Sequence, residues 1–449
     1  MSGPSRQNPN NPQDQPGSTR IVAGQSAAPK RPLGLKVGIA VGILALIGGG
    51  VAVASAVNGG TPAAVQETAT AGNPAAELKL GYFGNVTHAP ALVGVSQGYI
   101  AEELGDTRLS TQVFNAGPAA IEALNAGAID ATYIGPNPAI NSFVKSGGES
   151  VNIIAGAAAG GAQLVVRPEI SSAADLRGKT LASPQLGGTQ DVALRAWLAS
   201  QGYKTNVDGS GDVAINPTEN AQTLKLFQDG KLDGAWLPEP WASRLVLTAG
   251  AKVLVDEKDL WDGSLSGKPG EFPTTILIVN QKFAADHPDT VKALLKGHVK
   301  SVEWLNDAAD GDKASVINAA LKEAAGAELK ADVIDRSLKN IVFTVDPLAG
   351  TYEKLLADGV AAGTTKQADI NGIFNLTALG NYIAAKGDHN DQHHRAGDHA
   401  GRNRPQAWSA WRPFPPAGPG DLRTGPARAG FTFPAGRQPG GRSPRLHAG

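Results

Sequence analysis

The chain of 449 residues contains no cysteine. This absence excludes disulfide bonds, thiolate metal sites, cysteine nucleophiles and a lipid-modified N-terminal cysteine. A dominant charge is also lacking, because 40 Lys and Arg stand against 41 Asp and Glu. The composition therefore gives no indication of a nucleic-acid partner, and we expect none. The length is sufficient for two or three domains with substantial cores.

The N-terminal region has two parts. Residues 1–36 are rich in Pro, Asn, Gln and Ser, which predicts a disordered cytoplasmic N-terminus. Residues 37–57 are uncharged and apolar over a length that can span a bilayer. Lys and Arg precede this segment and none follows before Lys79, so the remainder of the chain is expected outside the cytoplasm. Ala54–Ala56 resembles a signal-peptidase site, so a retained anchor and a cleaved signal sequence both stay open.

Beyond a predicted linker at 58–77, short apolar strands alternate with helices, which predicts an α/β fold with largely parallel sheets. Two such series occur, and the second is inserted in the first. We assign residues 78–162 and 274–386 to lobe I and residues 163–273 to lobe II. Two crossings then join the lobes, and a ligand is expected in the cleft at the carboxyl ends of the strands.

Residues 387–449 differ from the rest, with many Arg, Pro, Gly and His and no Lys. Three interpretations are open: a basic tail that binds metal or an acidic surface, a disordered tail, and a frameshifted extension past the natural stop. We favour the frameshifted extension. No metal site is assigned to His393, His394 and His399.

The stretch "QLGGTQDVALRAW" (185–197) joins a strand to a helix through a glycine turn. Free N–H groups and the dipole at such a helix start favour an anion, so Gly188, Thr189 and Gln190 are candidate anion ligands. The stretch is neither a P-loop nor a dinucleotide fingerprint. Ordinary helix capping by Thr189 or Asp191 is the simpler alternative.

Similar chemistry recurs at the ends of other predicted strands. Taken singly, each such residue has a simpler explanation: a loop histidine, a core tryptophan, or a glutamate at a helix start. Their recurrence at successive strand ends is what predicts a binding site. The candidates outside the glycine turn are Asn85, Thr87, His88, Asn137, Gly161, Trp236, Glu239, Thr274 and Thr275.

Three segments carry a family resemblance: "AIEALNAGAIDATYIGPNP", "ADLRGKTLASPQLGGTQDVALRAWLASQG" and "LKLFQDGKLDGAWLPEPWAS". Over 78–386 the chain resembles the substrate-binding proteins of ABC importers for aliphatic sulfonates, taurine and nitrate. The resemblance implies a type II periplasmic-binding-protein-like fold, in which two α/β lobes with two crossovers enclose a central ligand cleft.

The resemblance also implies roles for individual residues. The anion donors of lobe II would be Gly188, Thr189 and Gln190. Lobe I would contribute Asn85, His88, Asn137 and Gly161. Trp236 and Glu239 would face the organic part of the ligand, and Glu239 would suit an amine such as that of taurine. Many relatives have Ser or Ala-His where this chain has Thr-Gln-Asp, which leaves a ligand different from theirs open. Pyrimidine-precursor binders share the fold and are a further alternative.

These observations predict an extracytoplasmic protein, membrane-anchored or secreted, that delivers a small oxyanion-bearing molecule to an ABC permease and its ATPase. We expect a monomer, no cofactor, no metal and no enzymatic activity, because no nucleophile–base pair is evident. The alternatives are a binder of nitrate or of a pyrimidine precursor, and a ligand-sensing ectodomain.

Overall fold

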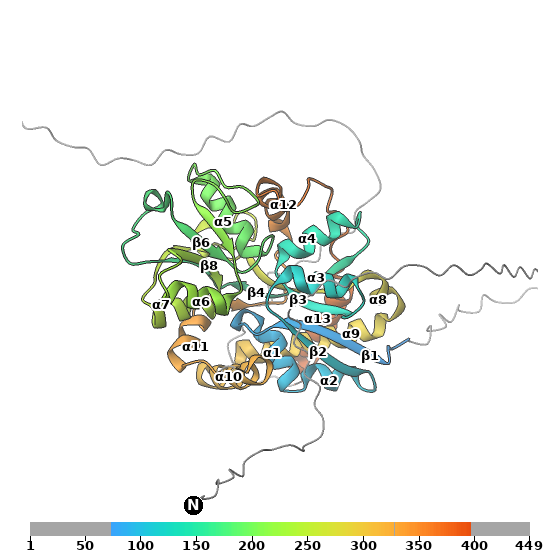
Figure 1. Cartoon of the computed structure of the whole chain (residues 1–449). Coiled ribbons are helices and arrows are strands. Elements are labelled where there is room, and N and C mark those ends of the chain that lie inside the picture. The colour runs from blue at the N-terminus through green and yellow to red at the C-terminus, as the bar shows by residue number, and fades with distance from the viewer. Residues whose placement is uncertain (1–72, 327, 397–449) are drawn as a thin grey trace, which may run out of the picture. The chain divides into compact units, whose positions relative to one another are not determined.

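The computed structural model describes residues 73–326 and 328–396, with side chains described as far as residue 386. In this part of the chain, helices surround two mixed β-sheets (Figure 1). The predicted N-terminus at 1–36, the apolar segment at 37–57 and most of the predicted linker and tail lie outside the described residues. No helix among the described residues has the length and apolarity needed to cross a membrane.

The first sheet has six strands in the order β11-β4-β10-β3-β1-β2, and the second has five in the order β7-β6-β8-β5-β9. The strands are β1 (Glu77–Phe83), β2 (Arg108–Phe114), β3 (Ala131–Ile134), β4 (Val151–Gly160), β5 (Ala162–Val166), β6 (Thr180–Ser183), β7 (Ala214–Pro217), β8 (Gly234–Pro238), β9 (Lys252–Asp256), β10 (Pro273–Asn280) and β11 (Ile341–Phe343).

Most strands are followed by a helix. The α-helices are α1 (Ala89–Ser96), α2 (Tyr99–Leu104), α3 (Gly117–Asn125), α4 (Pro136–Lys145), α5 (Thr189–Ser200), α6 (Asn220–Gln228), α7 (Trp241–Ala249), α8 (Gln281–Asp286), α9 (Pro288–Asp307), α10 (Asp310–Ala325), α11 (Ala331–Leu338), α12 (Tyr352–Ala361) and α13 (Thr377–Ala396). The 3₁₀ helices are η1 (Val86–His88), η2 (Ala173–Leu176), η3 (Glu257–Leu260) and η4 (Ala349–Thr351).

The chain passes between the sheets twice, as the sequence predicts. β4 leads directly into β5 through Gly161, and the chain returns to the first sheet at β10. Both entering strands run antiparallel to their neighbours, β5 against β8 and β9, and β10 against β3 and β4. The expectation of largely parallel sheets is therefore wrong. A parallel connection within one sheet needs a crossover helix, and neither entering strand follows one.

Three apolar clusters hold the two sheets and their helices together. One lies between the first sheet and helices α1, α2, α9 and α10. The second runs from the first sheet to the second and includes Trp197, Trp236 and Leu355. The third lies between the second sheet and helices α6 and α7. In Figure 1, α5 lies on one side of β6 and β8, and α6 and α7 lie on the other. The second cluster thus packs the two sheets and their helices into one core.

Two predicted boundaries differ from the structure. Folded contacts begin inside the predicted linker, since Ala75 donates its N–H to Thr290 and accepts a hydrogen bond from the Thr107 hydroxyl. At the other end, α13 continues to Ala396, past the predicted start of the tail at 387.

Candidate ligand-binding site

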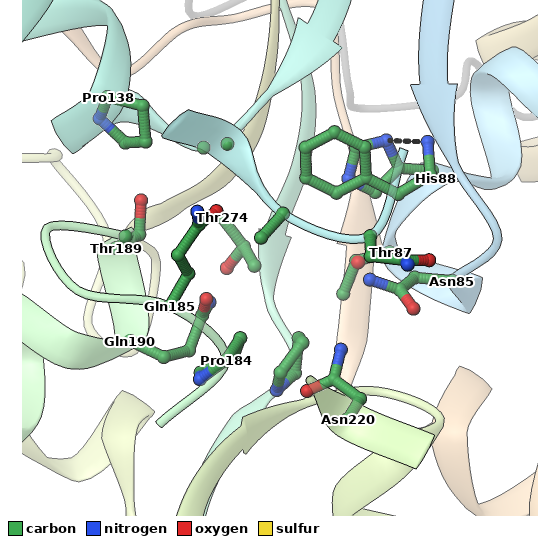
Figure 2. A pocket seen from close by; sticks show the side chains of 17 residues that line it. Asn85, Thr87, His88, Pro138, Pro184, Gln185, Thr189, Gln190, Asn220 and Thr274 are labelled. Carbon is green, nitrogen blue, oxygen red and sulfur yellow. Dashed lines mark hydrogen bonds between the residues drawn. The ribbon is translucent and has the colours of Figure 1, made fainter. Parts of the chain in front are cut away.

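A pocket lies where loops from both sheets meet, and it holds about 430 Å³ free of protein atoms, including space open to solvent. Figure 2 shows residues of the first sheet's loops on one side and those of the β6–α5 turn on the other. The lining residues are Phe83, Asn85, Thr87, His88, Asn115, Ala116, Gly117, Gly135, Pro138, Pro184, Gln185, Gly188, Thr189, Gln190, Asn220, Pro238 and Thr274.

The N-terminal ends of several helices converge on this pocket. The lining includes residues at the starts of α3, α4, α5 and α6, and Asn85, Thr87 and His88 of the turn that leads through η1 into α1. A helix start carries unpaired N–H groups and a partial positive charge. The pocket therefore favours negative charge even though none of the lining residues in the described part of the chain is Lys or Arg.

The β6–α5 turn supplies the clearest anion-binding geometry. The first helical hydrogen bond runs from Val192 N–H to Gly188 C=O, which leaves the N–H groups of Thr189, Gln190 and Asp191 without a partner inside the helix. Gly188 N–H is occupied by Gln185 C=O. The N–H groups of Thr189 and Gln190 thus remain as oriented donors at the edge of the pocket, which is the arrangement that holds oxyanions in proteins.

Asp191 fixes this turn and does not face the ligand space. Its fully buried carboxylate accepts hydrogen bonds from Ser183 Oγ (2.7 Å), Gly187 N (3.0 Å) and Arg195 Nε (3.0 Å). The capping alternative holds for neither Thr189 nor Asp191, because Gly188 is the N-cap and no side-chain cap bond forms there. The N–H that Asp191 binds belongs to Gly187, which precedes the helix.

Thr189 instead contacts α4 of lobe I. Its Oγ accepts a hydrogen bond from Asn137 N–H at 3.4 Å, so its hydroxyl proton stays available for an acceptor in the pocket. The approach requires glycine at the start of α4, because a Cβ on Gly135 would collide with Thr189 Oγ. Thr189 is thus both a contact between α5 and α4 and a candidate donor.

On the opposite side, His88 offers one defined donor. Phe83 N–H donates to His88 Nδ1 at 3.3 Å, and the Phe83 ring stacks on the imidazole at 4.3 Å between centroids. Burial lowers the pKa of His88 to about 3, so the ring is neutral at physiological pH. With Nδ1 acting as acceptor, the single ring proton lies on Nε2 and can be donated.

Seven of the twelve predicted site residues line the pocket: Asn85, Thr87, His88, Gly188, Thr189, Gln190 and Thr274. Among these, Thr274 already donates its hydroxyl proton to Gly160 C=O and retains only acceptor capacity. The structure does not bring the other five into the lining.

Trp236 is a core residue. Its side chain is fully buried, its Nε1 donates to Glu257 Oε2 at 2.7 Å, and its ring packs against Trp197. Burial raises the pKa of Glu257 to about 8. The expectation that Trp236 faces a ligand is wrong, because its indole is enclosed by the core between the two sheets.

Glu239 is also misassigned by the sequence. It is fully buried and accepts four hydrogen bonds, from Ser243 N, Ser337 Oγ, Arg336 Nη1 and Asn340 Nδ2. Its charge is compensated by Arg336 at 3.1 Å. Glu239 therefore joins the β8–α7 loop to α11 and leaves no carboxylate for a ligand amine.

The other three predicted site residues outside the lining are Asn137, Gly161 and Thr275. The Asn137 amide donates to Leu355 C=O at 3.0 Å and joins α4 to α12. Gly161 occupies the β4–β5 crossing with φ of 75°, and its C=O accepts from Glu239 N–H. Thr275 follows Thr274 in β10, and adjacent strand residues face opposite sides.

Sequence reasoning missed three polar lining residues, Asn115, Gln185 and Asn220. The sequence pattern that identified the other candidates, a polar residue after a strand, also fits these three, since each follows a strand and precedes or begins a helix. The oxygens Gln185 Oε1 and Asn220 Oδ1 are buried and have no hydrogen-bond partner in the described part of the chain. These atoms are acceptors that a ligand donor would satisfy.

Buried titratable groups predict that stability is greatest near pH 6.5. Burial lowers the pKa of His88 to about 3 and that of His298 to about 4, so the unfolded chain binds more protons below pH 6.5 and acid destabilises the fold. Glu257, with its pKa raised to about 8, keeps its proton in the folded state up to that pH, whereas the unfolded chain loses this proton above pH 4.5. The folded state therefore binds more protons between pH 4.5 and 8, and Glu257 lowers the stability as the pH rises toward 8.

Urea unfolding between pH 4 and pH 8 measures this profile, with slopes of up to about 1.4 kcal/mol per pH unit for each group. Glu257→Gln keeps an acceptor for Trp236 and is expected to flatten the limb between pH 6.5 and 8. An unchanged alkaline limb in that variant would contradict the assignment of Glu257.

The fold and the pocket define a class: a two-lobed α/β protein with two crossovers and a polar cleft between the lobes. Residues 71–320 match the profile of the NMT1-like family, and the chain belongs to this family. The two-lobed α/β fold with two crossovers that the sequence predicted is confirmed by the two sheets and the two crossings between them.

Two relatives of this chain have names that state a ligand. The chain is 28% identical over 211 residues to the taurine-binding periplasmic protein of Escherichia coli, covering 47% of this chain and 61% of that protein. It is 24% identical over 336 residues to a putative aliphatic sulfonates-binding protein of Bacillus subtilis, covering 69% and 84%. The chain thus spans less than two thirds of the taurine-binding relative.

Solved structures show the same fold. The alkanesulfonate-binding protein SsuA from Xanthomonas axonopodis pv. citri, bound to MOPS, aligns with a TM-score of 0.54 at 21% identity, over 66% of this chain and 96% of that one. The periplasmic nitrate-binding protein NrtA from Synechocystis PCC 6803 aligns with a TM-score of 0.54 at 17% identity, over 72% and 89%.

Proposed function

We propose that this protein binds a small molecule with an oxyanion group, an aliphatic sulfonate or taurine, and delivers it to an ABC importer. The observation that carries this proposal is the convergence of helix N-termini and uncharged donors on one pocket. Donors held by the fold before binding need little reorganisation, so they stabilise an anion without a buried lysine or arginine.

The side chains that surround the pocket favour an organic ligand with a second polar group. Gln185 Oε1 and Asn220 Oδ1 are unsatisfied acceptors, and an ammonium group such as that of taurine would satisfy both. Nitrate has no donor for them. Taurine therefore fits the described lining better than nitrate does.

We propose a binding role without catalysis. His88 is the one titratable side chain in the described lining, and its Nδ1 is occupied by Phe83 N–H. Acid–base catalysis and nucleophilic catalysis need a second group within hydrogen-bond reach of the first. A pocket of neutral donors meets the requirement for binding alone.

The partners follow from this role. We propose that the lobes close on the ligand by hinge motion at the two crossings and that the closed form docks on a permease driven by a separate ATPase. The apolar segment at 37–57 supports an extracytoplasmic location, as an anchor or as a signal sequence. The name of the taurine-binding relative, a periplasmic protein, agrees with that location.

A thermal-shift assay on the full chain in mild detergent tests the ligand class. Taurine or ethanesulfonate at 100 times its Kd is expected to stabilise the folded state by about 2.7 kcal/mol, which raises the melting temperature by several degrees. Nitrate, sulfate and a pyrimidine precursor are the comparison ligands. A shift with the pyrimidine alone would replace the oxyanion proposal.

Thr189→Ala is expected to weaken sulfonate binding by about tenfold or more, because it removes a hydrogen bond to a charged group worth about 1.5–3 kcal/mol. Thr248→Ala is the matched control, since Thr248 is an exposed helix residue that bonds only to Arg244 C=O. Equal affinities in the two variants, measured by calorimetry, would remove Thr189 from the site.

A further inference from the structure

One hydrogen bond links the polar lining of the pocket to a residue outside it. Trp241 Nε1 donates to Asn85 Oδ1 at 2.9 Å. Asn85 follows β1 of the first sheet and lines the pocket, whereas Trp241 begins α7 behind β8 of the second sheet and does not line it. The bond therefore joins the two lobes beside the proposed ligand.

This bond determines which end of the Asn85 amide is free. An indole N–H only donates, so it must be paired with the amide oxygen. The Asn85 NH₂ group then remains for the pocket, and no hydrogen bond to it occurs within the described part of the chain. An amide without this constraint can rotate by half a turn and present its oxygen, which repels an anion.

The segment that carries Trp241 is itself held in place from both lobes. The Glu239 carboxylate binds Arg336 and Asn340, and the Glu239 C=O accepts a hydrogen bond from Thr87 N–H at 3.4 Å. The Arg244 guanidinium lies 4.4 Å from the centre of the Trp241 ring. The indole is thereby fixed in direction as well as in position.

We infer that Trp241 is a positioning residue: by holding Asn85 Oδ1 across the lobe boundary, it makes the Asn85 NH₂ a donor to the ligand oxyanion. This inference rests on the proposed function. It implies that the Asn85 donor is oriented only when the second lobe lies where it does in this structure, so lobe position and anion recognition are coupled through one bond.

A double-mutant cycle on the full chain tests the inference, with ethanesulfonate as the probe and calorimetry as the measurement. Trp241→Phe keeps the ring and removes the donor, and it is expected to weaken binding about tenfold. Asn85→Ala is expected to weaken it by a similar factor. In the Asn85→Ala background, Trp241→Phe is expected to change the affinity less than twofold, because its effect acts through the missing amide.

Trp304→Phe is the matched control, since Trp304 is a half-buried tryptophan on α9, away from the pocket. The Trp304→Phe variant is expected to bind ethanesulfonate with the same affinity as the unmodified chain. If the losses of affinity caused by the two site substitutions multiply in the double variant, or if Trp241→Phe alone has no effect on affinity, Trp241 does not position Asn85.

The indole N–H signal in NMR spectra of the unliganded chain separates this inference from the proposed function. Asn85→Ala is expected to move the Trp241 signal away from the hydrogen-bonded range and to leave the Trp304 signal unchanged. An unmoved Trp241 signal overturns the contact whatever ligand binds. If the signal moves but the unmodified chain binds neither ethanesulfonate nor taurine, the proposed function fails, and the positioning role fails with it.

Discussion

Replacing Gln190 by Glu is expected to weaken binding of an oxyanion ligand by at least about 100-fold. Gln190 lines the pocket at the second position of α5, and its side chain makes no hydrogen bond within the described residues. The substitution keeps the shape and adds a negative charge. Two like charges about 4 Å apart repel by roughly 4 kcal/mol at an effective dielectric constant of about 20.

The fold is expected to survive this substitution, because an acidic side chain in the first turn of a helix is favourable. Gln190→Met is the control, since it removes the amide without adding charge and is expected to cost no more than about tenfold. The comparison is made by calorimetry with ethanesulfonate. Equal affinities for the Glu and Met variants would mean that the ligand anion does not lie near α5.

Replacing Asp191 by Ala is expected to destabilise the protein by about 3–5 kcal/mol. The Asp191 and Arg195 side chains are 0% and 1% exposed, and the carboxylate accepts hydrogen bonds from Ser183 and Gly187 as well. Removing one partner of a buried ion pair leaves an uncompensated charge, which is far more costly than the net worth of the pair. Urea unfolding of the full chain measures the loss.

The matched control is Asp229→Ala, which breaks an exposed i,i+4 pair with Lys225 and is expected to cost less than about 0.5 kcal/mol. The double variant Asp191→Ala/Arg195→Met removes both charges and is expected to recover much of the stability. A loss below about 1 kcal/mol for Asp191→Ala would contradict the account of this turn.

The parts of the site that the sequence predicted correctly depend on local patterns. The strand, glycine turn and helix around Gly188 and Thr189 are consecutive in the chain, so their geometry follows from a short stretch. Alternation of strands and helices predicted both crossings for the same reason. Asn115 and Asn220 obey the same strand-end rule and could have been included.

The parts that failed depend on partners far away in the sequence. Glu239 forms hydrogen bonds with Arg336 and Asn340, which lie 97 and 101 positions further along the chain. No local sequence pattern predicts that pairing. Trp236 is enclosed by the apolar cluster between the two sheets, and Glu257 at the start of η3 accepts its indole N–H. For Thr274 and Thr275, strand alternation predicts that only one faces the pocket, but the choice depends on how β10 is placed in its sheet.

The most direct test of the central claim compares ethanesulfonate with ethanesulfonamide, its neutral and nearly isosteric analogue, by calorimetry on the full chain. If converging helix N-termini and neutral donors hold an anion, the sulfonate binds saturably with one site per chain, and the sulfonamide binds at least about 100-fold more weakly. Equal affinity for the two would show that the pocket recognises shape and not charge, and would contradict the account.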